Sequence, residues 1–136
     1  DANEPPIAEA EIELLDDILS LKETVPHVLS ALRDITVDMP AISEAVTRLS
    51  RRADAMAARG VDVEHLEFEA SYGRTSMEYY DGFVFGFYAE GRPDLPPVAT
   101  GGRYDALTSV LGQGRSIPAV GGVMRPGLML ALKGDA

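Results

Sequence analysis

The spacing of the apolar residues changes near Gly60, and this change constrains the fold more than any other feature of the sequence. Before Gly60 the apolar residues recur at steps of three and four, which is typical of amphipathic helices. After it, apolar and acidic residues alternate, which is typical of a half-buried strand. The sequence therefore predicts an α+β fold, with N-terminal helices followed by a mainly antiparallel sheet with helices. We expect a helical segment at 1–60 and a second segment at 61–136, together forming one domain.

Three helices are predicted in the first segment. The apolar runs that indicate them cover residues 7–25, 28–35 and 42–57. Pro26 and Pro40 mark the starts of the second and third helices, because proline suits the first turn of a helix. Asp38 is expected to cap the third helix, and Gly60 is expected to end it.

The second segment is predicted to combine short strands with two short helices. The expected strands are 61–69, 83–88, 98–100 and 117–123, and the expected helices are 104–111 and 127–132. Asp81-Gly82 before the second of these strands is a turn signal. Gly121 and Gly122 indicate that the backbone comes close to another group near the last strand.

Charge and composition exclude several classes of function. The net charge of −10 repels phosphate backbones, so no nucleic-acid partner is expected. Arg48, Arg51 and Arg52 form a small basic cluster that is expected to be a solvated helix face. His27 and His65 have no ligand-spaced partner, so no metal site is predicted. The sequence has neither a dinucleotide fingerprint nor a P-loop, and no cofactor is expected. The lack of a leader peptide, of cysteine and of an apolar run of roughly 20 residues favours a cytoplasmic protein without a membrane span.

Tyr79 and Tyr80 are the first candidates for a binding site. Adjacent side chains on an extended chain point to opposite faces, so one ring would pack in the core and the other would offer its hydroxyl to a cavity. A phenol combines an apolar face with a donor and an acceptor, which suits a flat polar ring such as an imidazole or a purine. The alternative is a pair of strand tyrosines that fill a sheet.

A second candidate site is the segment 101–105, with the sequence GGRYD. Gly101 and Gly102 are expected between a strand and a helix, where glycine lets the backbone approach a ligand or adopt positive φ. Amides at the start of the helix favour a carboxylate. Arg103 could pair with Asp105 or with a ligand carboxylate. The alternative is a tight turn with a salt bridge.

Together these motifs resemble the catalytic core of class II histidyl-tRNA synthetases. The matching parts are residues 74–85, 101–107, 111–112 and 118–121. In that family the first motif has the form R-G-L-D-Y-Y-T-G-x-V-F-E, and the second contains G-G-R-Y-D. The resemblance implies a synthetase-like sheet with a histidine pocket. The pocket residues that it implies are Arg74, Glu78, Tyr79, Tyr80, Gly101, Gly102, Arg103 and Tyr104.

The sequence departs from the synthetase motifs at positions that the family uses for catalysis. Thr75 occupies the position of the family's arginine, and Arg74 lies one residue further away. The family's Glu-Arg pair, whose arginine holds ATP, is absent from the glycine-rich end, where Arg125-Pro126 falls at a different register. The first two class II motifs and an anticodon-binding domain have no counterpart in this sequence. No catalytic residue is therefore expected.

This combination resembles the synthetase paralogues that serve as regulatory subunits of ATP phosphoribosyltransferase. The resemblance implies a C-terminal piece of such a subunit that binds L-histidine and regulates histidine biosynthesis. It also implies a hetero-oligomer with the short catalytic subunit, and self-association of the full-length protein. Two alternatives stay open. One is a fragment of a histidine–tRNA ligase whose missing motifs lie before Asp1, and the other is a structural interaction domain with a vestigial pocket.

Overall fold

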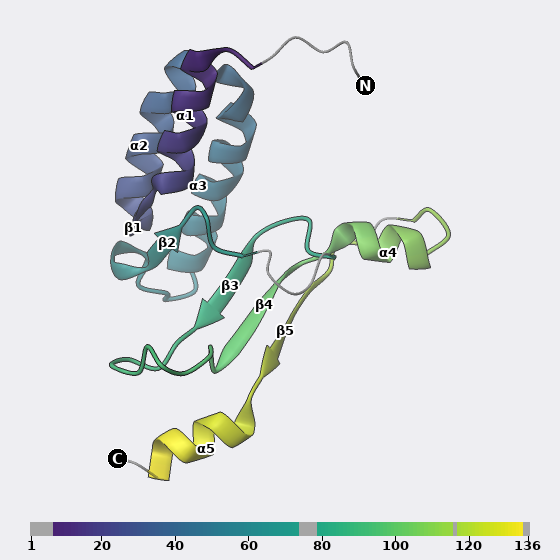
Figure 1. Ribbon diagram of the computed structural model, residues 1–136. Helices are drawn as coiled ribbons and strands as arrows, with labels where there is room; N and C mark the ends of the chain where they lie inside the picture. Colours follow the sequence, from purple (N-terminus) through teal and green to yellow (C-terminus); the bar gives the residue numbers. More distant parts are fainter. Residues whose placement is uncertain (1–6, 74–78, 116, 135–136) are drawn as a thin grey trace. The chain divides into compact units, whose positions relative to one another are not determined.

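The structure is a computed structural model that describes residues 7–73, 79–115 and 117–134. The chain divides into two compact units, Asp1–Ser71 and Tyr72–Ala136. Each unit contains helices and antiparallel strands (Figure 1), which confirms the predicted α+β class. The assignment of domains to 1–60 and 61–136 stays a prediction. No helix in the described part of the chain has the length and apolar character that crossing a membrane requires.

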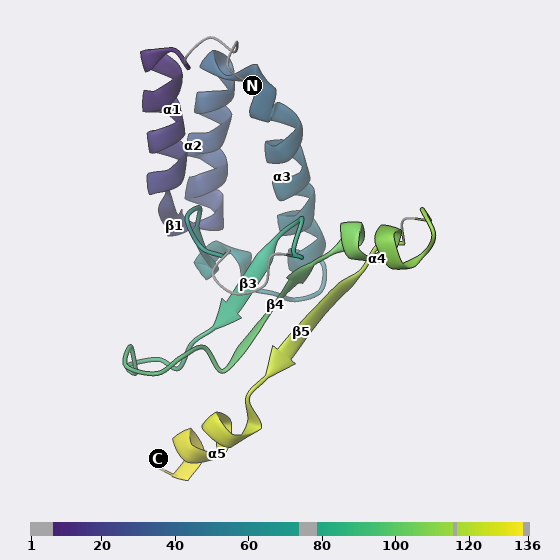
Figure 2. The same ribbon diagram turned by 45° about the vertical axis from the view of Figure 1, so that its right-hand side comes forward.

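The first unit is a group of three helices with a two-stranded sheet (Figures 1 and 2). Its elements in chain order are α1 (Glu9–Ser20), β1 (Lys22–Thr24), α2 (Val25–Asp38), η1 (Pro40–Ile42), α3 (Ser43–Ala57), η2 (Val63–His65) and β2 (Glu67–Glu69). Helix α2 is the centre of the core, because four of its residues are buried and it packs against α3. The buried core residues are Val25, Val28, Leu29, Leu32, Val46 and Ala53.

Three expectations for this unit were wrong in detail. The first helix ends at Ser20 instead of continuing to residue 25, and β1 follows it. The strand expected at 61–69 is confined to β2, which pairs antiparallel with β1. Asp38 is the last residue of α2 and does not cap α3. Local apolar spacing could not reveal β1, because its hydrogen bonds go to residues more than forty positions along the chain.

The second unit contains a three-stranded antiparallel sheet, with one helix between β4 and β5 and another after β5. Its elements are β3 (Val84–Phe87), β4 (Ala99–Arg103), α4 (Asp105–Leu111), β5 (Val120–Met124) and α5 (Pro126–Gly134). The strand order is β3-β4-β5, and the views in Figures 1 and 2 show β4 between its two neighbours. All five elements were predicted from the sequence with small differences at their ends.

The register of this sheet places glycines next to one another on adjacent strands. Val84 pairs with Gly102, and Gly102 pairs with Gly121. Because paired residues on neighbouring strands share a face, these three residues line one side of the sheet. The next pairs, which include Gly101 and Phe85, line the opposite side. The Tyr80 and Tyr104 side chains lie over the first of these faces.

Candidate functional site

Three of the predicted site residues come together over the sheet of the second unit. Tyr79 and Tyr80 precede β3, and Tyr104 lies between β4 and α4. The ring centroids of Tyr79 and Tyr80 are 4.6 Å apart, and the Tyr104 ring lies 5.5 Å from Tyr79 and 6.2 Å from Tyr80. The Tyr79 and Tyr104 rings meet edge to face, which is a favourable aromatic geometry. We call these three residues the tyrosine cluster.

The expectation that Tyr79 and Tyr80 point to opposite faces was wrong. It assumed an extended strand, but β3 begins only at Val84. Neither tyrosine belongs to a strand, so the alternation of side chains does not apply to them. The contact between the two phenols raises the pKa of Tyr80, first through a hydrogen bond with the Tyr79 side chain and then through burial. The Tyr80 phenol is therefore neutral at physiological pH and can both donate and accept a hydrogen bond.

Gly101 and Gly102 lie inside β4, and not in a turn between a strand and a helix as expected. Both are buried, and neither has positive φ. A Cβ atom at Gly102 would lie 2.7 Å from the Phe83 carbonyl oxygen and 2.8 Å from the Tyr80 ring. A Cβ at Gly121 would lie 2.8 Å from the Tyr104 hydroxyl. Gly102 and Gly121 thus let the Tyr80 and Tyr104 side chains lie directly against the sheet.

Arg103 makes the internal ion pair that was one of its two predicted alternatives. Its guanidinium Nη2 lies 2.7 Å from Oδ2 of Asp105, and its Nε donates to the same oxygen at 2.9 Å. The other carboxylate oxygen of Asp105 accepts the Ala119 amide at 2.8 Å. The Ala119 amide and then the Arg103 guanidinium hold the pKa of the Asp105 carboxyl below its ordinary value. Arg103 thus ties the end of β4 to the start of α4.

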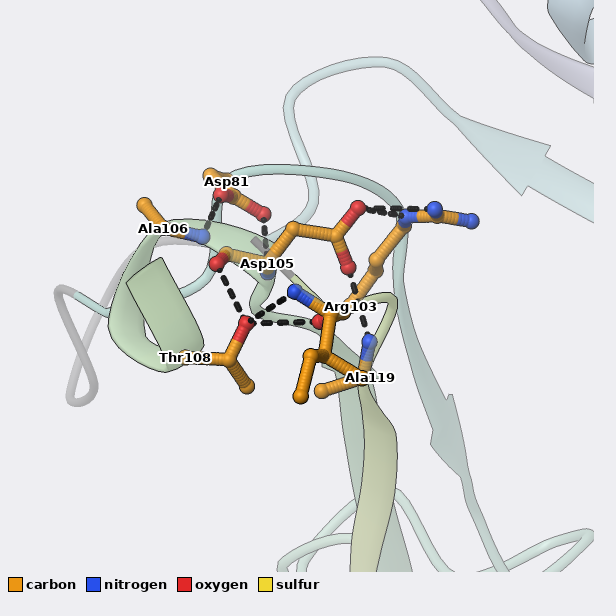
Figure 3. A network of polar contacts seen from close by, with 7 residues as sticks. Asp81, Arg103, Asp105, Ala106, Thr108 and Ala119 are labelled. Atoms are coloured by element: carbon orange, nitrogen blue, oxygen red, sulfur yellow. Dashed lines mark hydrogen bonds and ion pairs between the residues drawn. The ribbon is translucent and has the colours of Figure 1, made fainter. Parts of the chain in front are cut away.

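Asp81 has a role in this region that its sequence context did not predict. Its carboxylate accepts the backbone amides of Asp105, at 3.0 Å, and of Ala106 (Figure 3). Tyr104, which precedes α4, makes no capping hydrogen bond with its own side chain. Asp81 therefore caps α4 from 24 residues away in the sequence. The Asp-Gly dipeptide indicated a turn but gave no signal of this remote partner.

The polar contacts that hold α4 in place extend beyond Asp81 and Asp105. Figure 3 shows the Thr108 hydroxyl next to the loop that leads to β5. This hydroxyl donates in the direction of the Asp105 and Ile117 carbonyl oxygens, at 2.7 and 2.6 Å, and accepts the Ile117 amide at 3.2 Å. The segment that carries Tyr79 and Tyr80 is thereby linked through Asp81 to the helix that follows Tyr104. The geometry of the tyrosine cluster therefore depends on polar contacts as well as on ring packing.

Two predicted site residues, Arg74 and Glu78, lie outside the described residues. In the part of the chain that the structure describes, no group of three or more His, Cys, Asp or Glu residues could hold a metal ion. The tyrosine cluster presents phenol hydroxyls and aromatic faces to a ligand, above a sheet lined with glycines. Such a surface can bind a flat ring and exchange hydrogen bonds with it.

Comparison with known proteins identifies the family. The histidyl-tRNA synthetase family model matches residues 2–126. The chain belongs to this family. Within it, the chain is 36% identical over 110 residues to an ATP phosphoribosyltransferase regulatory subunit from Agrobacterium fabrum, covering 80% of this chain and 28% of that protein. No solved structure matches the chain.

Other relatives carry the same name. The chain is 35% identical over 121 residues to the ATP phosphoribosyltransferase regulatory subunit of Rhizobium etli, which covers 88% of the chain and 31% of the relative. The chain is 30% identical over 113 residues to the Brucella ovis protein of that name, which covers 82% of the chain and 30% of the relative. The predicted resemblance to these regulatory subunits is confirmed. The chain covers less than a third of the length of each of these relatives.

Proposed function

We propose that this chain is part of a non-catalytic regulatory subunit of ATP phosphoribosyltransferase, and that its tyrosine cluster binds L-histidine. The observation that carries the proposal is the convergence of Tyr79, Tyr80 and Tyr104 over the glycines of the sheet. It occurs in a chain whose relatives are named as such regulatory subunits. An imidazole ring can stack on a phenol face and exchange hydrogen bonds with its hydroxyl.

The other pocket residues have distinct proposed roles. Gly102 seats the Tyr80 ring, and Gly101 leaves room for the Phe85 ring on the opposite face of the sheet. Arg103 braces the floor of the pocket, because its guanidinium is already paired with Asp105. Arg74 and Glu78 are proposed to approach the ligand, with Glu78 receiving an ammonium or imidazole proton.

The partner follows from the name of the relatives. A regulatory subunit of ATP phosphoribosyltransferase assembles with a catalytic subunit, so we propose a hetero-oligomer with the short catalytic form in the cytoplasm. Binding of histidine, the end product of the pathway, at the tyrosine cluster would regulate the activity of the catalytic partner. Self-association is proposed for the full-length protein, and no nucleic-acid or membrane partner is proposed.

Calorimetric titration of L-histidine into the full-length protein tests the proposed site. Tyr80→Phe removes a single hydroxyl and is expected to weaken histidine binding about three- to tenfold, the value of one hydrogen bond. Tyr88→Phe is the matched control, because Tyr88 contacts Tyr72 and lies outside the tyrosine cluster. Absence of histidine binding, or equal loss in both variants, would contradict the proposed pocket and favour a structural interaction domain.

A histidine–tRNA ligase fragment is the second candidate, and the match to the histidyl-tRNA synthetase family model is the observation that favours it. The two candidates differ in chemistry, because a ligase activates histidine with ATP. Histidine-dependent exchange of pyrophosphate into ATP by the full-length protein would establish the ligase. Histidine binding without exchange, together with inhibition of the catalytic transferase subunit by histidine, supports the regulatory subunit.

A further inference from the structure

A groove between α2 and α3 provides a second candidate site, in the helical unit. Its volume is about 330 Å³. Its walls contain the apolar side chain of Val46 together with two arginines and four hydroxyl residues. The polar residues are Arg33, Thr36, Ser43, Thr47, Ser50 and Arg51. The volume is near the lower end of the range for pockets that bind small molecules.

The two arginines of the groove have no partner of opposite charge among the residues that the structure describes. Arg33 donates to the Ser50 hydroxyl at 3.4 Å, across the two helices. Within the residues that the structure describes, neither Arg33 nor Arg51 makes an ion pair with a carboxylate. Arg48, which is close to Arg51 in the sequence, is different because it pairs with Glu44 along α3. The basic cluster of the sequence is therefore divided, and only part of it faces the groove.

Only some of the hydroxyls in the groove can donate a hydrogen bond to a ligand, because others already donate to the backbone. Thr36 and Thr47 donate to carbonyl oxygens of their own helices, at 2.6 and 2.9 Å. The Ser50 hydroxyl accepts from Arg33 and donates to no residue that the structure describes, so its hydrogen is available to a ligand. Ser43, at the start of α3, has no side-chain hydrogen bond to any residue that the structure describes. Two guanidinium groups and two serine hydroxyls can thus donate into the same groove.

We propose that this groove binds the phosphate group of a small phosphorylated ligand. Two guanidinium groups in one groove repel each other unless an anion lies between them, and their planar donors match the oxygens of a phosphate. Free serine hydroxyls add donors of the kind that phosphate oxygens accept. The net charge of −10 disfavours a long polyanion on this chain, whereas a small ligand senses mainly the local field.

The test is a titration of the full chain with inorganic phosphate and with pyrophosphate at constant ionic strength. Chemical shifts of the α2 and α3 amides are followed by NMR, together with the Arg33 and Arg51 Nε signals. Saturable shifts are expected for groove residues. Arg33→Gln and Arg51→Gln are each expected to raise the Kd about tenfold, the effect of one charge-assisted contact.

Arg48→Gln is the matched control, because it removes an arginine of the same helix that is already paired and lies outside the groove. Its Kd should equal that of the unmodified chain. Circular dichroism confirms that each variant is folded. The absence of saturable shifts would overturn the proposal, and so would equal weakening by all three substitutions, which indicates nonspecific charge effects. A single-stranded RNA that bound more tightly than pyrophosphate and lost binding in the same two variants would also overturn it.

Discussion

Removing the Asp81 carboxylate is expected to destabilise the start of α4. The helix has seven residues, and the only side chain that accepts its first amides is that of Asp81, within the part of the chain that the structure describes. Asp81→Ala leaves the Asp105 and Ala106 amides without this acceptor. Loss of a capping side chain costs about 0.5–2 kcal/mol, and hydrogen bonds to a charged group lie at the upper end of such values. We therefore expect α4 to lose about 1–2 kcal/mol of local stability.

Native-state hydrogen exchange measures this loss at the affected amides. A change of about 1–2 kcal/mol corresponds to exchange that is roughly 5- to 30-fold faster in α4. Asp81→Asn keeps one acceptor oxygen and should give a smaller increase. Glu90→Ala is the control, because this exposed carboxylate lies outside the network of Figure 3. If α4 exchanged at the same rate in Asp81→Ala and in the unmodified chain, the capping argument would be refuted.

Two further predictions concern the sheet and its ion pair. Gly102→Ala places a methyl group against the Phe83 carbonyl and the Tyr80 ring, so it should lower the free energy of unfolding by about 1–3 kcal/mol in denaturant titration. Gly127→Ala, where the added methyl meets no neighbouring atom, should not lower it. The pKa of the Asp105 carboxyl is lower in the folded state, so its contribution to stability is present above the unfolded value of about 3.9 and disappears as pH falls through the folded value. The stability difference between the unmodified chain and Asp105→Asn should therefore shrink below about pH 4, and a difference that did not change with pH would contradict the assignment.

Much of the secondary structure could be predicted from local patterns. The second and third helices follow from apolar residues at steps of three and four, because such residues share one face of a helix. Pro26 lies in the first turn of α2 as predicted. The strands and helices after β2 were also recognisable, although Gly101 and Gly102 proved to be part of β4. A glycine pair indicates close approach of the backbone, but it does not say whether a turn or a strand uses the space.

The order and spacing of the motifs at 74–85, 101–107, 111–112 and 118–121 were sufficient to predict the family, and the family model that matches residues 2–126 confirms it. Only the tertiary structure decided how those residues meet. The Tyr79 and Tyr80 rings turn toward Tyr104, and Asp81 caps a helix that begins 24 residues later. The pairing of β1 with β2 and the groove between α2 and α3 were likewise decided only by the tertiary structure. Each joins residues that are distant along the chain, and such contacts depend on how whole elements pack and leave no periodic signal in the local sequence.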